Sequence, residues 1–237
     1  MNDVLAAKAS SEASAVEFDH WWRSQGAWVE PANQCRGGES GVQLLQRDVG
    51  PPLYCKRQIG HTYRTLLHPL SRPTVLRELQ AYRAFARLGV RTPRLVYGGV
   101  RKRQGQWQAL LVTEALQDFV SLEQWYADGA SAALKESVLR RLASALAHLH
   151  LAGWQHGCCY PKHVFVKAGE DENGAHRAEI ALLDLEKSRR RLSAKAAGRH
   201  DLGQLIRHRG NIPEADLSFF QQIYRQRLAE PPLMPQS

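Results

Sequence analysis

The order of secondary-structure signals along the chain is the feature that most restricts its fold. Two short runs with strand character, residues 43–47 and 53–58, flank Gly50-Pro51-Pro52. Neither a helix nor a strand ladder accommodates that tripeptide, so the two runs predict a hairpin. Residues 95–100 and 108–114 predict a second strand pair across a basic turn. The first half of the chain is therefore expected to be rich in strands.

One helix is expected between these strand pairs, over residues 71–88, with Ser71 as its N-cap and Gly89 as its end. On a helical wheel Glu78 falls within the apolar face of this helix. A carboxylate in that position is costly unless a cation meets it, and Lys56 in the preceding strand is the natural partner. Alternatively, Glu78 lies at the edge of the helix and meets a nearby arginine.

The second half of the chain reads as helical with one small hairpin. Apolar residues recur at helical spacing over residues 134–150, and a polar loop follows at 156–163. Residues 164–166 and 180–183 are short apolar runs around an Asn-Gly turn, which predicts a hairpin. A further helix is expected to include residues 215–228. A lobe rich in strands thus precedes a helical one, which indicates an α+β fold.

Composition places the chain among ordinary globular proteins. Its 237 residues are 43% hydrophobic, enough for one large domain or two packed lobes. No run approaches the roughly 18 apolar residues needed to cross a bilayer, and the first residues lack a secretory layout. The four cysteines show no CxxC spacing, so reduced thiols in the cytoplasm are expected.

The net charge of +9 is concentrated in residues 187–209, which carry eight Lys/Arg against one acidic residue, Asp201. Such a run attracts polyanions, among them nucleic acid, phosphorylated sugars and an anionic membrane surface. A solvated loop is the plain alternative. No aromatic residues interleave with the basic ones, so nucleic acid is not an expected partner.

Glycines precede the first predicted strand, in Arg36-Gly37-Gly38-Glu39-Ser40-Gly41. Gly38 and Gly41 could let backbone N–H groups approach a phosphate closely. The run matches neither GxGxxG nor a Walker A motif, so a plain turn is an equal alternative.

The polar loop carries the most specific pattern, His156-Gly157-Cys158-Cys159-Tyr160-Pro161-Lys162-His163, and the hairpin after it ends in Leu183-Asp184-Leu185-Glu186. Protein kinases carry H-R-D-x-x-x-x-N, a short strand pair and then D-F-G in this order. The lipopolysaccharide kinases of the WaaP/InaA type, with H-R-D-C-Y-x-x-H and D-L-x-(R/K), resemble the chain more closely. The residues that fit the latter version are Cys159, Tyr160, His163, Asp184, Leu185 and Lys187.

The resemblance runs from about residue 37 to residue 228 and implies a two-lobed, protein-kinase-like α+β fold. A loose N-terminal arm (1–17) would precede an N-lobe with a small antiparallel sheet (18–116) and a reduced helical C-lobe (117–237). It also implies Mg²⁺ and ATP as cofactors and phosphorylation of a hydroxyl in the lipopolysaccharide core. The acceptor would be an anionic glycolipid or phosphorylated sugar, reached in the cytoplasm or peripherally at the inner face of the membrane.

The resemblance also assigns roles to individual residues. Lys56 and Glu78 would position the phosphates, and the backbone after Glu114 would receive adenine, although Glu114 also reads simply as a polar residue closing a strand. Asp184 would bind Mg²⁺, and His163 stands where the metal-binding Asn of kinases belongs, as a ligand or as a hydrogen-bonding group. The basic residues expected to bind the acceptor are Arg189, Arg190, Arg191, Lys195 and Arg199.

Two further residues are expected to support the loop. His156 would brace it from within. Asp201, in an Arg-His-Asp-Leu segment, would either brace the catalytic loop or cap a helix.

One departure from the family pattern bears on activity, because the aspartate expected to accept the proton of the acceptor hydroxyl is replaced by Cys158, and the arginine before it by Gly157. A thiol accepts a proton poorly unless it is already a thiolate. A pseudokinase that binds nucleotide without efficient transfer is therefore the alternative to a kinase. A small-molecule phosphotransferase would share the fold but would keep the aspartate.

The loop also permits a zinc interpretation, since imidazole and thiolate are usual ligands of that metal. The four residues of this alternative are His156, Cys158, Cys159 and His163.

Overall fold

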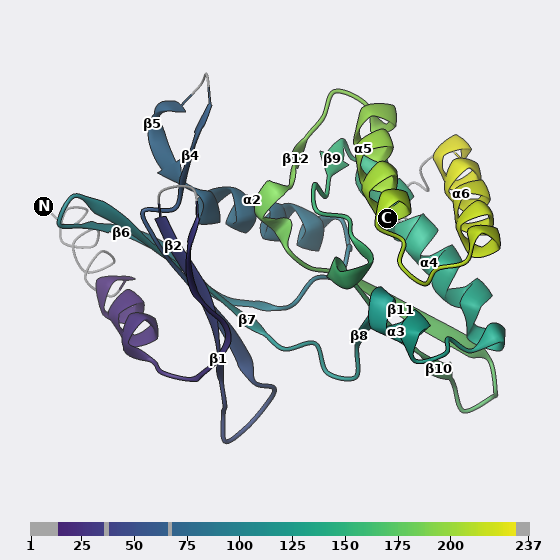
Figure 1. The fold of residues 1–237 in the computed structure, drawn as a ribbon, viewed down its shortest axis with the longest axis horizontal. Helices are drawn as coiled ribbons and strands as arrows, with labels where there is room; N and C mark the ends of the chain where they lie inside the picture. Colours follow the sequence, from purple (N-terminus) through teal and green to yellow (C-terminus); the bar gives the residue numbers. More distant parts are fainter. Residues whose placement is uncertain (1–13, 36–37, 66–67, 231–237) are drawn as a thin grey trace, which may run out of the picture. The chain divides into compact units, whose positions relative to one another are not determined.

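The computed structural model describes residues 14–35, 38–65 and 68–230 and divides into two compact units. Unit 1 is Met1–Leu79 with Pro93–Gln117, and unit 2 is Gln80–Thr92 with Asp118–Ser237. Figure 1 shows the strands of the first and the helices of the second. Within the described ranges, no helix is both long and apolar enough to cross a membrane.

Unit 1 is built on a five-stranded antiparallel sheet in the order β1-β2-β3-β7-β6. Both predicted hairpins are present, β2 with β3 and β6 with β7. The strands of the sheet are β1 (Ala27–Cys35), β2 (Gly38–Leu45), β3 (Leu53–Ile59), β6 (Leu95–Arg103) and β7 (Gln106–Glu114). A separate ribbon pairs β4 (Thr62–Thr65) with β5 (His68–Pro73).

A helix over residues 14–23 covers part of this sheet through Phe18, which is buried. Phe18 belongs to a core cluster with apolar residues of β2, β3 and β7, and its ring stacks on Trp22. Residues 14–17, which the sequence analysis placed in the N-terminal arm, form the first turn of this helix. Residues 1–13 of that expected arm lie outside the described ranges.

Helix α2 (Thr74–Arg87) starts three residues later than predicted. Ser71 lies in β5 and does not cap the helix, because the chain stays extended until Pro73. The end is as predicted, since Gly89 has φ +67°, a left-handed conformation that suits glycine.

Unit 2 is mainly helical, and α4 lies at its centre. Apolar residues on one face of α4 are buried, and α4 packs against α6 and β11. The predicted hairpin is formed by β10 and β11, and Gly174 in its turn has φ +74°. The helices are α3 (Leu122–Ala127), α4 (Ala132–Leu151), α5 (Ala194–Arg207) and α6 (Glu214–Ala229). The strands and 3₁₀ turns are β8 (Val120–Ser121), β9 (Trp154–Gln155), η1 (Pro161–His163), β10 (Val164–Glu170), β11 (His176–Leu182), η2 (Leu185–Lys187) and β12 (Arg189–Arg190).

The sequence did not predict a helix that begins at Ala194; it offered a solvated loop as one alternative for the basic run and Asp201 as a possible helix cap. Ser193 caps the start of α5, and its side chain accepts a hydrogen bond from the Ala196 N–H at 3.2 Å. The buried residues of α5 are Ala197, Gly198, Asp201, Gln204 and Leu205. They follow a helical period, but three of the five are glycine or polar, so the apolar signal is too weak to detect.

Candidate active site

In unit 1 the predicted ion pair between strand and helix is present. The Lys56 ammonium on β3 lies 3.0 Å from a carboxylate oxygen of Glu78 on α2. The Glu78 side chain is 3% exposed and that of Lys56 is 18% exposed. The cation explains how an ionised group can lie within the apolar face of the helix.

Gly38 and Gly41 lie within β2, where close packing accounts for both. A Cβ at Gly38 would lie 2.5 Å from the Ile59 carbonyl oxygen, and one at Gly41 would lie 2.9 Å from the Ala32 Cα. Glycine is thus required by neighbouring backbone alone. A contact with phosphate stays a prediction.

Glu114 ends β7 and its carboxylate pairs with arginines. Arg94 Nε donates to it at 2.7 Å, and Arg47 lies 3.7 Å away. These cations outweigh the opposing effect of burial, and the hydrogen bond from Arg94 is the main reason that the pKa of Glu114 is lowered. The backbone N–H of Glu114 donates to Arg94 and that of Ala115 to Pro52. These two N–H groups already have partners, and a contact of adenine with the backbone after Glu114 stays a prediction.

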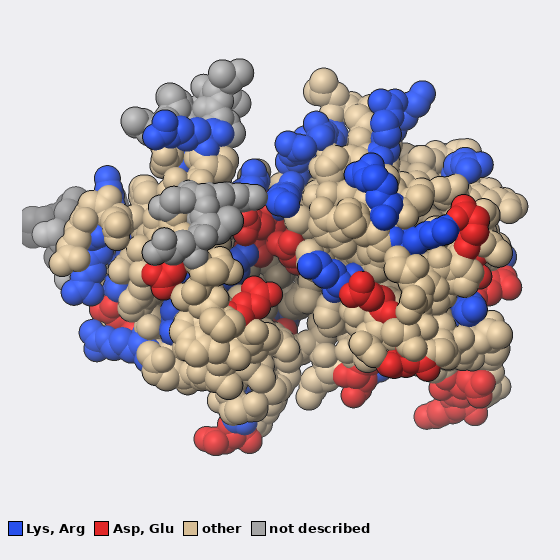
Figure 2. All heavy atoms as spheres, viewed as in Figure 1, with Lys and Arg blue, Asp and Glu red and all other residues tan. Residues whose placement is uncertain are grey.

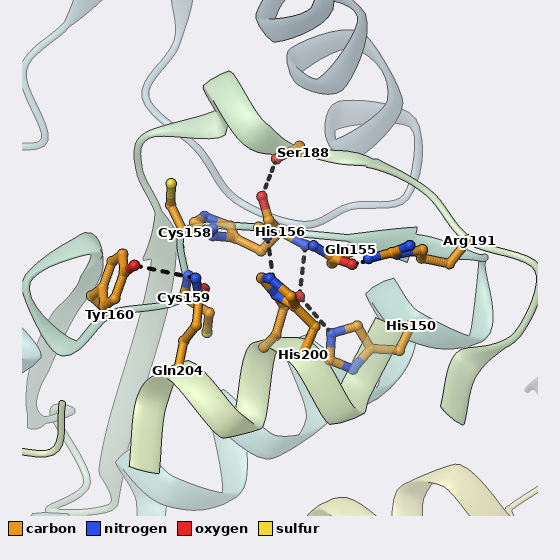
Figure 3. A network of polar contacts seen from close by, with 12 residues as sticks. His150, Gln155, His156, Cys158, Cys159, Tyr160, Ser188, Arg191, His200 and Gln204 are labelled. Atoms are coloured by element: carbon orange, nitrogen blue, oxygen red, sulfur yellow. Dashed lines mark hydrogen bonds and ion pairs between the residues drawn. The ribbon is translucent and has the colours of Figure 1, made fainter. Parts of the chain in front are cut away.

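In unit 2, Asp201 on α5 holds the backbone of the loop that follows β9. Its carboxylate accepts hydrogen bonds from the backbone N–H groups of His156 at 2.7 Å and Gly157 at 2.9 Å. His150 Nε2 also lies 3.0 Å from it, and Figure 3 shows His150, His156 and His200 gathered around this network. Asp201 therefore braces the loop, which is one of the two roles predicted for it. It is no helix cap, because α5 begins at Ser193.

The brace continues into α4 and α6. The hydroxyl oxygen of Tyr224 on α6 lies 2.7 Å from His150 Nδ1, so the imidazole of His150 links this hydroxyl to the Asp201 carboxylate. A Cβ at Gly198 would lie 2.1 Å from the Tyr224 hydroxyl oxygen, so glycine there makes room for the contact. Gln204 accepts the Cys159 N–H at 2.9 Å. Sequence reasoning missed His150, Gln204 and Tyr224; a histidine on the apolar face of α4 was the one available signal.

His156 is fully buried and acts on the loop itself. Its Nδ1 accepts the Cys158 N–H at 3.2 Å, and its carbonyl accepts the Ser188 hydroxyl at 2.7 Å. Burial lowers the pKa of His156 despite the nearby charges of Asp201 and Asp184. The imidazole is thus neutral and positions the loop rather than moving protons.

The backbone around position 157 leaves no room for the arginine that the family pattern has there. The φ of Gly157, +88°, lies in the left-handed region, and an added Cβ would lie 2.4 Å from the Lys187 carbonyl oxygen. The loop passes so close to the Lys187 backbone that any side chain at this position would clash.

Cys158 occupies the position of the family base and is 1% exposed. Burial, followed by the charge of Asp184 and its hydrogen bond, raises the pKa of Cys158 to about 12. The thiol is therefore protonated at neutral pH and cannot act as a general base there.

Asp184 follows β11 and takes a left-handed conformation, with φ 58° and ψ 66°. Non-glycine residues rarely adopt it, and such strain is concentrated at functional sites. His163 Nδ1 lies 3.6 Å from an Asp184 carboxylate oxygen and 3.0 Å from the Cys158 carbonyl oxygen. The two predicted metal residues are thus brought together.

The four-residue zinc cluster considered from the sequence does not form. His156 is turned into the loop, and Cys159 is fully buried beside the Gln204 contact. The residues whose ligand atoms converge are instead Cys158, His163 and Asp184. Sequence spacing alone could not show this, because Asp184 lies beyond the intervening hairpin.

The basic residues predicted to bind the acceptor lie on β12, on the loop after it and on the first turns of α5. Figure 2 shows Lys and Arg side chains gathered over these elements. Arg190 lies over the Trp154 ring, 5.9 Å from its centroid, and Arg191 donates to the Gln155 side chain. Lys195 and Arg199 are exposed and one helical turn apart, so they share a face.

Comparisons with known proteins bear on the family and the fold of the chain. The model of the lipopolysaccharide kinase (Kdo/WaaP) family matches residues 19–224. In the solved structures, "WaaP in complex with acyl carrier protein" matches with a TM-score of 0.65 and 22% identity, over 89% of this chain and 82% of that one. A chain of the yeast RNA Pol II CTD kinase CTDK-1 complex matches with a TM-score of 0.43 and 11% identity, over 71% and 48%, too low to support a conclusion.

The fold is thus that of the protein-kinase-like proteins, and the chain belongs to the lipopolysaccharide kinase (Kdo/WaaP) family. Among curated proteins it is similar to Protein InaA of Escherichia coli (strain K12). The two are 42% identical over 204 residues, which is 84% of this chain and 91% of that protein. Membership of the family supports a kinase-like role with use of ATP.

Proposed function

We propose that the chain uses Mg²⁺ and ATP to phosphorylate a sugar hydroxyl of the lipopolysaccharide core at the cytoplasmic face of the membrane. The buried pair of Lys56 and Glu78 is the observation that carries the proposal. A desolvated ion pair is costly to maintain, and in protein kinases this pair holds a lysine against the ATP phosphates. Its presence in a family of kinases supports a nucleotide site.

Each unit contributes its own residues to this function. In unit 1, Lys56 would contact the α- and β-phosphates while Glu78 fixes its ammonium group. In unit 2, Asp184 would hold Mg²⁺, with His163 beside it, and His156 and Asp201 would keep the loop in place. The metal would neutralise charge that develops on the phosphates.

Proton removal from the acceptor is the weak point of this mechanism, because Cys158 is protonated at neutral pH. Phosphoryl transfer depends mainly on positioning and charge neutralisation, so the reaction can proceed without a base. Loss of a general base typically costs about 10²–10⁴ in rate. We therefore expect slow turnover.

A pseudokinase is the second candidate, and the same cysteine favours it. In that case the nucleotide would bind as a ligand, and no phosphate would be transferred. The two candidates differ in a measurable way, since only the first yields product at a rate above background.

We assign the acceptor site to the basic surface, defined as Arg189, Arg190, Arg191, Lys195 and Arg199. Leu192 lies within this surface and its side chain is fully exposed. An apolar side chain among cations suits the surface of an anionic membrane, where the glycolipid acceptor would reside. The acyl carrier protein with which the matched WaaP was solved is an alternative occupant of this surface.

The membrane assignment is tested by sedimentation with vesicles that contain anionic lipid. Leu192→Ser should weaken binding about fivefold or more, and Arg190→Gln with Lys195→Gln should weaken it further, most strongly at low salt. Leu151→Ser, at a half-exposed leucine on α4, serves as the matched control. Equal binding by all variants would contradict the assignment, and so would binding of acyl carrier protein but not vesicles.

The proposed activity is tested by thermal shift with Mg²⁺ and ATP, followed by phosphate transfer to dephosphorylated core oligosaccharide. Wild type should be stabilised by ATP and transfer phosphate slowly, while Lys56→Ala and Asp184→Ala should do neither. Lys167→Ala, which removes a surface ion pair, is the control. No stabilisation by ATP contradicts both candidates. ATP binding without transfer, together with transfer by Cys158→Asp, would identify a pseudokinase.

A further inference from the structure

Three side chains of different chemistry converge beside the loop. The ligand atoms of Cys158, His163 and Asp184 all lie within 4.8 Å of one another. His163 Nδ1 and the nearer Asp184 oxygen are 3.6 Å apart. Two ligand atoms on a tetrahedral zinc ion lie about 3.4 Å apart, given bonds of about 2.0–2.2 Å. This pair is therefore already close to the separation that coordination requires.

Backbone hydrogen bonds hold the three residues in one local framework. The Tyr160 N–H donates to the Cys158 carbonyl at 2.8 Å, and the His163 N–H donates to the Tyr160 carbonyl at 2.9 Å. The Leu183 N–H donates to the His163 carbonyl at 2.9 Å, which ties the residue before Asp184 to the same turn. The backbone positions from which the three side chains converge are thus tied to one another.

The chemistry of the three ligands selects the metal. Mg²⁺ requires near-octahedral oxygen coordination, to which a thiol and an imidazole contribute nothing. Zn²⁺ binds sulfur, nitrogen and carboxylate oxygen, and sites with three protein ligands keep a fourth position open. We propose that Cys158, His163 and Asp184 form a site for a thiophilic divalent cation. The cation is Zn²⁺, and its fourth coordination position is open.

This inference deepens the proposed function, because Asp184 is also the Mg²⁺ ligand proposed there, but binding of the cation requires no nucleotide. The ion displaces the thiol proton of Cys158, which passes to the buffer. If Nδ1 of His163 coordinates, its hydrogen bond to the Cys158 carbonyl, now 3.0 Å, is exchanged for the bond to the metal. Zn²⁺ would thus compete with Mg²⁺ for Asp184, and the thiolate of Cys158 would favour binding of Zn²⁺.

Cobalt titration of the metal-stripped, full-length protein tests the site without nucleotide. Co²⁺ replaces Zn²⁺ in tetrahedral sites and gives a thiolate-to-metal charge-transfer band in the near ultraviolet. We expect the band in wild type, its displacement by equimolar Zn²⁺ and its persistence in millimolar Mg²⁺. Cys158→Ser should bind Co²⁺ at least about tenfold more weakly and show no such band.

Cys159→Ser is the matched control, since it removes a neighbouring buried thiol that points away from the cluster. It should keep the band. His163→Ala, at a partly exposed position, should keep the thiolate band but bind Co²⁺ more weakly. No band in wild type overturns the proposal, and so does an undiminished band in Cys158→Ser.

A thermal shift with Mg²⁺ and ATP on the same metal-stripped preparation separates this inference from the proposed function. ATP stabilisation without a cobalt band rejects the zinc site and leaves the nucleotide site standing. A cobalt band without ATP stabilisation supports the zinc site and rejects the nucleotide site. If Cys158→Ser does not fold, the loss of affinity in His163→Ala decides the matter, because unchanged affinity there excludes the three-ligand site.

Discussion

Replacement of Asp201 by alanine is expected to destabilise unit 2 strongly. The carboxylate is fully buried and accepts the N–H groups of His156 and Gly157. Each buried donor left without an acceptor costs about 1–3 kcal/mol, so the two together cost about 2–6 kcal/mol. That is a large part of the roughly 5–15 kcal/mol that a domain has in total.

Differential scanning fluorimetry and urea unfolding at pH 7.5 measure this loss. At about 2–4 °C per kcal/mol for a chain of this size, a loss near 4 kcal/mol lowers Tm by roughly 8–16 °C. Asp201→Asn keeps one acceptor oxygen and should fall between wild type and alanine. Asp118→Ala, which removes an exposed carboxylate paired with Lys167, should have little effect.

The pH dependence gives a second readout for Asp201. Burial raises its pKa, but the hydrogen bond from His150, the influence of the neighbouring His156 and the Gly157 N–H outweigh burial and lower it overall. A carboxyl with a depressed folded pKa stabilises above its unfolded pKa of about 4, and this stabilisation is lost as pH falls toward the folded value. The titratable groups around it are His150 on α4, His156 and Cys159 in the loop, His200 on α5 and Tyr224 on α6.

The advantage of wild type over Asp201→Ala should therefore be greatest near neutral pH and shrink below about pH 4. A destabilisation under about 1 kcal/mol at pH 7.5, or a difference that stays constant down to pH 3, would refute the role assigned to the carboxylate.

Three further predictions concern other residues of the site. Gly157→Ala should lower the free energy of unfolding by at least about 2 kcal/mol, because its Cβ would meet the Lys187 carbonyl at a positive φ. In the same urea unfolding assay, Gly174→Ala in an open turn should cost only about 1 kcal/mol. Lys56→Met should cost about 2–4 kcal/mol, since Glu78 loses the ammonium beside it, and adding Glu78→Gln should restore part of the loss in the same assay; no recovery would contradict the pairing. Cys158 should resist iodoacetamide in the native protein at pH 7.5 and react only after unfolding, because its raised pKa of about 12 leaves almost no thiolate. Peptide mass spectrometry measures the labelling, and rapid labelling of the native protein would exclude a buried thiol.

Elements with strong local signals could be predicted from the sequence. The Gly-Pro-Pro and Asn-Gly turns defined their hairpins, and the apolar period over residues 134–150 defined α4. The charge of Glu78 on an apolar face pointed to Lys56, since a buried carboxylate requires a cation. The hairpins and α4 follow from local sequence, whereas Lys56 and Glu78 are 22 residues apart and were linked by their opposite charges.

Helix α5 and the convergence of Asp184 with Cys158 depend on tertiary contacts and could not be predicted. Helix α5 is buried through Gly198, Asp201 and Gln204, whose value as core residues comes from partners on the loop and on other helices. Likewise, Asp184 joins Cys158 only because an intervening hairpin folds back on itself. Hydrophobic periodicity carries no information about such contacts.

The support of the loop by α5 also has an evolutionary consequence. Asp201 and Gln204 grip the loop by the backbone N–H groups of residues 156, 157 and 159, and no side chain of the loop takes part in these three bonds. The shape of the loop is thus independent of the side chain at position 158. A lineage with this scaffold could lose the proton acceptor, acquire a different chemistry there and later regain the first, without rebuilding the fold at any step.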